Sequence, residues 1–349
     1  MKFYKDLYWS IISPKTLFRA WEIFKSDKRK KPDVALFERD IEKNIFDLYR
    51  DLKDETYKHG AYKGFWIHDP KLRRIHKATV RDRVLHHAMF SVLNKIYEPT
   101  FISDSYSCRI NKGTHKGMKR VVGMIRAVSK NYTHPCYALK CDIRKFFDSI
   151  DHNILLKILG EKIKDEKVMN LLNEIIGSFE TSRANLFEPK GVPIGNLTSQ
   201  IFANIYMDKF DQFVKHVLKV KNYARYTDDF IVISDNVTYL EELLIPIRQF
   251  LKDELRIELH PNKVILRKYN QGIDFLGYVI LPHHIKIRTK TKRKIPKKLR
   301  LNVSMYRSGD LSEISLKSSL VSYLGVLSHA NAYDISRSIQ NEFWFWMRE

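Results

Sequence analysis

An adjacent pair of acidic residues, Asp228 and Asp229, lies between two short apolar segments at 223–226 and 230–234. Two short apolar, β-branched runs on either side of a polar break are typical of a β-hairpin. On a continuous strand, adjacent side chains point to opposite faces, whereas at a hairpin turn both carboxylates can project into one site. The pair therefore predicts either an ordinary Asp-containing turn, which is common, or an acidic site at one end of a sheet.

A third acidic residue makes the acidic site the better interpretation. Asp142 lies at the end of another apolar strand, expected over 137–143. Carboxylates that pack closely repel one another unless cations neutralise them, and Mg²⁺ prefers a few carboxylates together with water and substrate phosphates. Two such ions about 4 Å apart would activate an attacking 3′-hydroxyl and stabilise a pyrophosphate leaving group. The sequence thus favours two Mg²⁺ ions, for which Mn²⁺ can substitute.

The composition points to a polyanionic partner. Lys and Arg number 62 against 40 Asp and Glu, which gives a formal net charge of +22 and an isoelectric point near 9.7. Such an excess most often indicates nucleic acid binding, and a solubility device is the alternative. Three cysteines without a C-x-x-C pair argue against a disulfide framework. No apolar run approaches the ~20 residues of a membrane span and the start lacks a secretory core, so we expect a cytoplasmic protein without membrane contact.

Five segments follow one another along the chain: 142–147 (D-x-x-x-x-[FY]), 191–200 (G-x-P-x-G-x-x-x-S-Q), 226–229 (Y-x-D-D), Lys263 and 275–278. In order and in spacing they resemble the motifs of one family, the reverse transcriptases, in which Lys263 would belong to the box after Y-x-D-D and 275–278 to the primer-grip element. The resemblance covers about residues 70–285. It implies an RNA-directed DNA polymerase, which uses dNTPs to copy template RNA into cDNA and holds the RNA–DNA hybrid.

The resemblance implies an α+β, right-hand polymerase fold, with fingers, a palm that contains an antiparallel sheet, and a short helical thumb. We expect an N-terminal helical region and fingers at 1–135, the palm at 136–284 and a basic thumb at 285–349. A helical insertion associated with the fingers is expected within the palm, at about 155–185.

Within this family, the chain is most similar to reverse transcriptases of diversity-generating retroelements, in the group II intron-like lineage of prokaryotes, which implies a bacterial, archaeal or phage-encoded protein. Residues 105–109, 113–115 and 193–204 carry that likeness. It implies errors at template adenines that serve targeted mutagenesis (mutagenic retrohoming), and a basic helical accessory protein that oligomerises. The alternatives are a retron or defence-associated reverse transcriptase, and a catalytically idle, maturase-like RNA-binding protein. A nucleotide cyclase is disfavoured, because it needs no template track.

The resemblance assigns catalysis and metal binding to Asp142, Asp228 and Asp229, with the backbone carbonyl of Ile143 completing a metal shell. Phe147 stands at the position of the family's steric gate. A bulky ring under the sugar leaves no room for a 2′-hydroxyl, so Phe147 is expected to select dNTPs. A plain core role for this side chain is the alternative.

Further nucleotide contacts are expected from the fingers and from the loop at 191–195. Arg73 matches the arginine that grips the triphosphate, since guanidinium forks suit phosphate oxygens, and Arg74 is a second candidate beside it. Lys263 is expected to protonate or orient the leaving pyrophosphate, with a solvated lysine as the alternative. Ile194 replaces the Gln of most reverse transcriptases, and the loss of an oriented polar contact should weaken base discrimination. Gly195 should allow close backbone approach to the base pair.

Template and primer contacts are expected from a larger set of loop, helix and thumb residues. This set comprises Arg109, Lys112, Pro193, Ser199, Gln200, Leu276, Gly277, Lys290, Lys292 and Arg293. The last three belong to a basic run at 286–300 that is expected to precede the thumb helices. Its charges would follow the phosphates of the hybrid and give affinity without sequence reading; a solvated charged face is the alternative.

Overall fold

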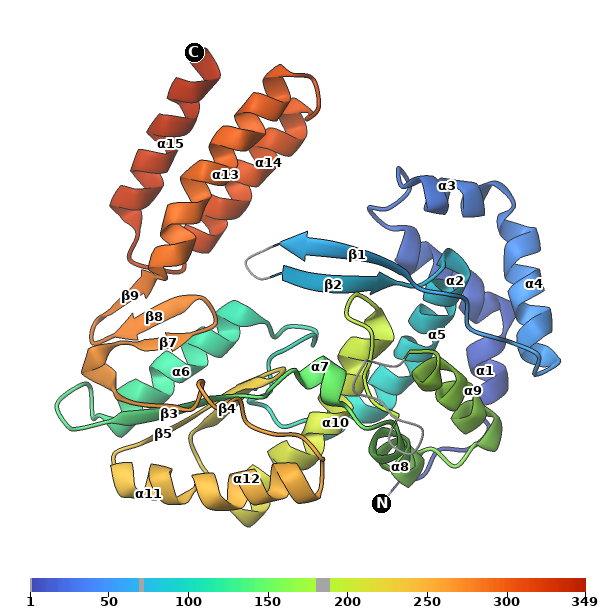
Figure 1. Ribbon diagram of the computed structural model, residues 1–349, viewed down its shortest axis with the longest axis horizontal. Coiled ribbons are helices and arrows are strands. Elements are labelled where there is room, and N and C mark those ends of the chain that lie inside the picture. The colour runs from blue at the N-terminus through green and yellow to red at the C-terminus, as the bar shows by residue number, and fades with distance from the viewer. Residues whose placement is uncertain (1, 69–71, 180–188) are drawn as a thin grey trace.

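The computed structural model describes residues 2–68, 72–179 and 189–349. Its centre is a four-stranded antiparallel sheet in the order β4-β5-β3-β6 (Figure 1). The strands are β3 (Tyr137–Asp142), β4 (Tyr223–Tyr226), β5 (Asp229–Ser234) and β6 (Ile265–Lys268). Along β3, Leu139 and Cys141 enter one hydrophobic core and Ala138 enters a second core on the other face. Burial on both faces fixes the register, because a slip of one residue would exchange the two faces.

Helices cover the face of the sheet that Leu139 and Cys141 enter. These are α10 (Leu197–Gln212), its one-turn continuation η2 (Phe213–Val217), α11 (Val237–Glu242) and α12 (Leu244–Asp253). The rings of Phe210 on α10 and Phe230 on β5 lie 5.0 Å apart. The sheet and α10 therefore share one core with the N-terminal helices.

The opposite face is covered by α6 (Thr114–Val128) and by a second, three-stranded sheet. That sheet consists of β7 (Ile273–Phe275), β8 (Tyr278–Leu281) and β9 (His284–Ile287), which follow the short η3 (Tyr269–Gln271). Val121 and Ile125 of α6 share a core with Ile231 of β5. Although α6 falls within the range expected as fingers, it packs on the palm sheet.

Three helices form the thumb: α13 (Thr289–Arg307), α14 (Glu313–Leu327) and α15 (Tyr333–Arg348). Ile295 and Leu299 of α13 are buried, whereas Lys290, Lys292 and Arg293 are exposed. The basic run expected to precede the thumb helices thus builds most of the first one. An amphipathic helix allows this, because its apolar stripe packs while its other face stays solvated.

The described residues up to 100 are helical apart from one hairpin. Its helices are α1 (Tyr8–Ile12), α2 (Pro14–Lys25), α3 (Pro32–Arg39), α4 (Ile41–Lys53), α5 (Val80–Tyr97) and η1 (Glu98–Thr100). The hairpin of β1 (Lys63–His68) and β2 (Leu72–Lys77) projects over the palm towards the thumb in Figure 1. None of the helices in the described ranges is both long and apolar enough to cross a membrane.

The expected helical insertion is present as α8 (His152–Lys162) and α9 (Glu166–Gly177), while 180–185 lie outside the described residues. Asp151 caps α8 by accepting the N–H of Ile154 at 3.0 Å. Asp165, which caps α9, also accepts the N–H of Leu7 at 2.7 Å. The insertion therefore packs against the N-terminal helices, on the fingers side of the molecule.

Candidate functional site

The three acidic residues meet at one end of the central sheet. In the antiparallel pair of β3 and β5, Asp142 lies directly opposite Asp229. Asp228 belongs to the two-residue turn between β4 and β5, and its carbonyl oxygen accepts the N–H of Ile143 at 3.3 Å. Directly opposed residues of an antiparallel pair have Cβ atoms about 4.5–5.5 Å apart. The structure thus brings together the three carboxylates that the sequence predicts at one site.

Two lysine side chains balance this negative charge. Lys263 Nζ lies 2.5 Å from Asp142 Oδ1. Lys140 Nζ lies 3.5 Å from Asp229 Oδ1. The loop that carries Lys263 is fixed beside β3, because the N–H of His260 donates to the Asp142 carbonyl at 2.7 Å. Sequence reasoning missed Lys140; its signal is a charged residue two positions before Asp142, on the same face of an otherwise apolar strand.

Burial and mutual repulsion oppose ionisation of these carboxylates. Burial, followed by the charges of Asp229 and Asp142, raises the pKa of Asp228 to about 6. Burial also raises the pKa of Asp229, against the opposing charge of Lys140. The Oδ1 atom of Asp229 is buried and accepts no hydrogen bond from the residues that the structure describes; its 3.5 Å contact with Lys140 is an ion pair. Buried carboxylates with raised pKa values are candidates for a functional site.

The donor set fits a hard divalent cation. Mg²⁺ binds through one or two carboxylates and completes its shell with water and substrate phosphates. Within the ranges that the structure describes, no three His, Cys, Asp or Glu side chains are grouped to hold a metal ion by themselves. An ion at Asp142, Asp228 and Asp229 would therefore take further ligands, such as the Ile143 carbonyl or a substrate phosphate. The expectation of two ions stays a prediction.

Phe147 lies just after the acidic end of β3, in the short helix α7 (Phe146–Ser149). Its carbonyl accepts the N–H of Val192 at 2.9 Å, which ties α7 to the loop that precedes α10. Phe146 is buried, whereas Phe147 is only partly buried, with the two ring centroids 5.5 Å apart. A partly accessible ring at this place can border a bound sugar, and its role as a gate stays a prediction.

The hairpin places Arg73 and Arg74 on opposite faces. Both lie within β2, the second strand of the hairpin, and adjacent residues of a strand point to opposite sides. Arg74 packs across Gly64 on the neighbouring strand, where an added Cβ would lie 3.2 Å from the Arg74 Nε atom. The two arginines therefore start from opposite faces of the hairpin, which favours a nucleotide contact for one of them only; the sequence suggests both, and this stays a prediction.

The loop before α10 docks on the hairpin face that carries Arg73. The N–H of His76 donates to the carbonyl of Ile194 at 3.1 Å. Gly195 has φ +118°, and an added Cβ would lie 2.7 Å from Ile75 Cγ2. Gly195 is thus required for close contact with the fingers, whereas the sequence suggests contact with a base pair. Because Ile75 and Arg73 are two residues apart on β2, Arg73 lies on the face towards this loop.

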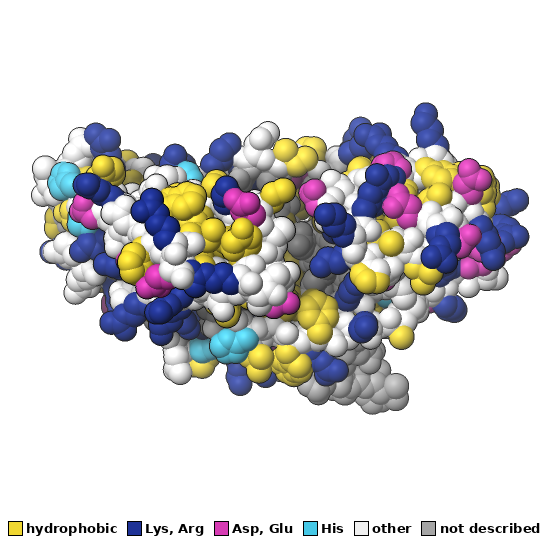
Figure 2. All heavy atoms as spheres, turned by 90° about the horizontal axis from the view of Figure 1, so that it is seen from above, with side chains coloured by type: hydrophobic (Ala, Val, Ile, Leu, Met, Phe, Trp, Pro, Cys, Tyr) yellow, Lys and Arg dark blue, Asp and Glu magenta, His cyan; other side chains and the backbone are white. Residues whose placement is uncertain are grey.

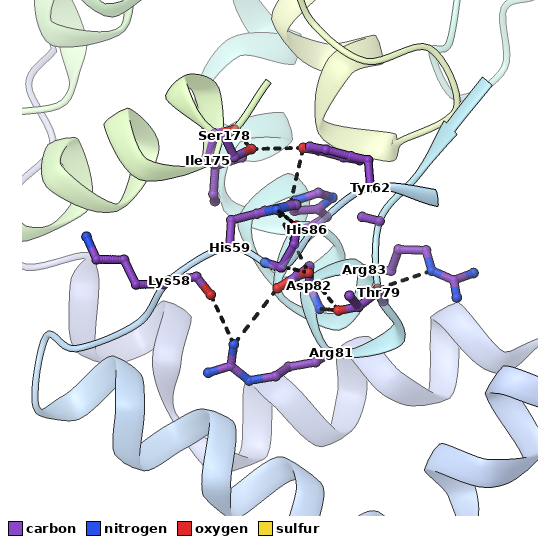
Figure 3. A network of polar contacts seen from close by, with 12 residues as sticks. Lys58, His59, Tyr62, Thr79, Arg81, Asp82, Arg83, His86, Ile175 and Ser178 are labelled. Carbon is purple, nitrogen blue, oxygen red and sulfur yellow. Dashed lines mark hydrogen bonds and ion pairs between the residues drawn. The ribbon is translucent and has the colours of Figure 1, made fainter. Parts of the chain in front are cut away.

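A buried polar network fixes the root of the hairpin (Figure 3). Asp82 on α5 accepts hydrogen bonds from Tyr57 Oη at 2.8 Å and from Thr79 Oγ1 at 2.6 Å. The Nε2 atoms of His59 and His86 lie 3.3 Å apart. Burial lowers the pKa of His86 to about 3, so this ring stays neutral. The sequence does not single out this network, since Asp82 lies between two arginines and resembles a solvated charge.

Two of the expected template contacts, Arg109 and Lys112, have other partners, and a third, Ser199, is buried. The Arg109 side chain is only 6% exposed, pairs with Glu98 at 2.9 Å and donates to two backbone carbonyls. Ser199 is 2% exposed within the core. Lys112 Nζ donates to the carbonyl of Ser103 at 2.6 Å. For Arg109 and Ser199 we correct the expectation, because buried side chains that support the fold are not accessible to a template.

Two of the remaining expected contacts, Leu276 and Gly277, line a groove of about 700 Å³ between α6, the β7–β8 turn and the thumb. Leu276 and Gly277 form this turn with φ +51° and +94°. Basic and small side chains line the groove, among them Lys112, His115, Lys116, Lys119 and Gly277. Pro193 is buried and Gln200 is exposed. Figure 2 shows Lys and Arg side chains spread over this view of the molecule, with a dense group on the thumb side.

A sheet with an acidic end, a hairpin above it and a helical thumb define a polymerase of the right-hand class. Residues 63–280 match the family described as "Reverse transcriptase (RNA-dependent DNA polymerase)". The chain belongs to this family.

The chain is also similar in sequence to two named bacterial proteins. Protein YkfC of Escherichia coli is 24% identical over 245 residues, which cover 60% of this chain and 64% of YkfC. The group II intron-encoded protein LtrA of Lactococcus lactis is 23% identical over 308 residues, which cover 68% of this chain and 50% of LtrA. The chain thus spans about half to two thirds of the length of these relatives. The solved structure of apo telomerase from Candida tropicalis superposes with a TM-score of 0.50 at 15% identity, over 83% of this chain and 57% of that chain, which supports the fold.

Proposed function

We propose that the protein is an RNA-directed DNA polymerase that copies template RNA into cDNA. The observation that carries the proposal is the register that sets Asp142 opposite Asp229, with Asp228 in the adjoining turn. Carboxylates with raised pKa values at this position destabilise the fold unless a cation compensates them. A binding-only protein would gain nothing from such a cluster.

In the proposed reaction, the 3′-oxygen of the primer attacks the α-phosphorus of a dNTP. The bond from the α-phosphorus to its bridging oxygen breaks, and pyrophosphate leaves. Mg²⁺ bound by Asp142, Asp228 and Asp229 would favour loss of the hydroxyl proton and neutralise charge on the leaving group, and Mn²⁺ can substitute. Arg73 would bind the triphosphate, and Phe147 would exclude a 2′-hydroxyl from the sugar site.

Two basic features support the handling of phosphates. Lys263, whose ammonium lies 2.5 Å from Asp142, is the candidate to give a proton to the leaving pyrophosphate. The groove beside α6 and the exposed charges of Lys290, Lys292 and Arg293 would follow the backbone of the hybrid. Such contacts give affinity that falls steeply with salt.

Primer extension on an RNA template with dNTPs and Mg²⁺ tests the proposal. The wild type should extend the primer, and Asp228→Ala should not. Asp253→Ala is the matched control, because Asp253 is an exposed acid at the end of α12. A folded wild type that binds RNA without extending any primer would contradict polymerase function and favour the idle RNA-binding alternative. Extension by Asp228→Ala would contradict the assigned site.

We further propose that the enzyme is a diversity-generating reverse transcriptase, error-prone at template adenines and assisted by a basic helical accessory protein. The support is Ile194, which lies beside the fingers hairpin and offers no polar group to an incoming base. Sequencing of cDNA should show frequent errors at adenines for the wild type and for Ile194→Leu, and fewer for Ile194→Gln. An accurate wild type would favour a retron or defence-associated enzyme instead. An error rate unchanged by Ile194→Gln would remove this residue from the explanation.

A further inference from the structure

Arg225, two residues before the acidic turn, is a fully buried guanidinium. Its Nε and Nη2 atoms lie 2.8 Å and 2.6 Å from the two carboxylate oxygens of Asp211 on α10. Tyr223 Oη also donates to Asp211 at 2.7 Å. A buried ion pair contributes little net stability, because the loss of hydration offsets most of the attraction between the charges. The pair therefore needs an explanation other than stability.

The same guanidinium reaches the turn that carries Asp228. Its Nη1 atom donates to the carbonyl of Thr227 at 2.9 Å, and its Nη2 atom donates to Ser105 Oγ at 3.1 Å. Thr227 has φ +56°, a left-handed conformation that a β-branched residue rarely adopts. The Thr227 hydroxyl lies 2.6 Å from Ser107 Oγ. Strained backbone of this kind persists only where the surrounding structure holds it.

The segment that supplies both serines is itself fixed along β4. The N–H of Arg225 donates to the carbonyl of Asp104 at 2.9 Å, and the N–H of Tyr106 donates to the carbonyl of Arg225 at 2.9 Å. Asn204 Nδ2 on α10 donates to the carbonyl of Ser107 at 2.8 Å. Residues 104–107 are therefore held at the edge of β4 by a single parallel bridge between Ser105 and Arg225, and they are tied to α10.

We propose that Arg225, Ser105 and Ser107 are positioning residues that hold the turn, and with it the Asp228 carboxylate, in the arrangement that binds the divalent cation. The inference rests on the proposed function, because it concerns the same acidic site. Three neighbouring carboxylates repel one another, so a freely flexible turn would move Asp228 away from Asp142. This clamp, which consists of the hydrogen bonds that Arg225, Ser105 and Ser107 make with one another and with Thr227, prevents the movement and preserves the affinity of the site for the cation. In this proposal, Ser105 accepts a hydrogen bond from Arg225, and Ser107 holds the Thr227 hydroxyl.

Two substitutions test the clamp without leaving a buried charge unpaired. Thr227→Val and Ser107→Ala each remove the hydroxyl contact between the two side chains. Tyr97→Phe is the control, because it removes a buried hydroxyl that donates to the Leu159 carbonyl at 3.1 Å, within the N-terminal half. Two quantities are measured: the Mg²⁺ concentration for half-maximal primer extension, and the Mg²⁺ concentration for half of the metal-induced rise in melting temperature.

The clamp predicts a roughly three- to tenfold higher Mg²⁺ requirement in both measurements for Thr227→Val and Ser107→Ala, from the loss of one hydrogen bond. Thr227→Ser keeps the hydroxyl and should therefore keep the wild-type Mg²⁺ requirement. The double variant of Thr227→Val with Ser107→Ala loses the same single contact, so it should need no more Mg²⁺ than either single variant. Tyr97→Phe should lower the melting temperature without changing the Mg²⁺ requirement. Wild-type Mg²⁺ dependence in both clamp variants would overturn the proposal and leave these contacts as plain packing.

The buried pair gives a second, independent test. Replacing both partners by Arg225→Met and Asp211→Leu leaves no unpaired charge, so the protein should fold yet need at least tenfold more Mg²⁺. An unchanged requirement in this double variant would also overturn the proposal. The melting measurement does not depend on polymerisation. A wild type that responds to Mg²⁺ without extending a primer would therefore contradict the proposed function and still leave the clamp testable.

Discussion

Replacing Asp228 by Asn should abolish polymerisation and, at the same time, stabilise the folded protein at neutral pH. Burial and the neighbouring carboxylates raise the pKa of Asp228 from 3.8 to about 6. A carboxyl whose pKa is higher in the folded state favours folding fully below pH 3.8, and this contribution is lost as the pH rises through 6. A shift of about 2 units corresponds to roughly 3 kcal/mol at pH 8. Partial exposure of Asp228 makes this an upper bound, and Asn removes the charge at nearly the same shape.

Urea unfolding followed by circular dichroism measures the effect. At pH 8, Asp228→Asn should raise the free energy of unfolding by about 1–3 kcal/mol, and the difference should vanish near pH 4. Asp253→Asn, the exposed control, should stay within about 0.5 kcal/mol of wild type. Mg²⁺ should stabilise the wild type by mass action and have little effect on Asp228→Asn. A less stable Asn variant at pH 8, or a difference independent of pH, would refute the reasoning.

Four further predictions concern sugar selection, nucleotide binding, the pH dependence of extension and the pH dependence of stability. Phe147→Ala should admit ribonucleotides in primer extension, and unchanged discrimination between dNTPs and rNTPs would remove the gate role. Arg73→Ala should raise the KM for dNTPs about tenfold or more, whereas Arg74→Ala should leave it nearly unchanged, as steady-state kinetics can show; equal effects would contradict the two-faced hairpin. Burial raises the pKa of Asp228 to about 6 in the absence of metal, so protons should compete with Mg²⁺ below about pH 6; the Mg²⁺ concentration for half-maximal extension should rise there, and a Mg²⁺ requirement that stays unchanged down to pH 5 would contradict the raised pKa. Burial lowers the pKa of His86 to about 3, so its stabilising contribution is full above pH 6.5 and is lost as the pH falls towards 3; His86→Leu should flatten the urea-unfolding profile across that range, and an unchanged slope would count against it.

The acidic site could be predicted because its geometry follows from strand patterns. Asp142 ends one apolar strand and Asp228 with Asp229 separates two others, and buried strands of this kind pair in a register set by their apolar faces. The sequence does not show which cations balance the three acids. Lys140 and Lys263 are 123 positions apart in the printed sequence, and only the pairing of β3 with its neighbours brings them to one edge.

Individual polar side chains were harder to assign, because burial depends on the tertiary fold. Arg109 and Ser199 occur in motifs associated with template binding, but the structure buries both side chains. Asp82 reads as one charge in a basic run, and yet it is the centre of a network that holds the hairpin root. Nothing local in the sequence separates these cases, since the same residue types occur on solvated surfaces.

Burial raises the free-energy cost of ionising Asp228, and the same burial explains why the ionised carboxylate should bind a cation well. The turn is fixed by Arg225 and Thr227, and the strands beside it are packed on both faces, so the carboxylates cannot separate to relieve their repulsion. Only a proton, a lysine or a metal ion can then lower the energy of the cluster. Below about pH 6, protonation of Asp228 lowers the energy of the cluster. Above that pH, the ion pairs with Lys140 and Lys263 compensate part of the negative charge. The energy that remains uncompensated is available as affinity for Mg²⁺, so stability without metal and affinity for metal should change in opposite directions across variants of this turn.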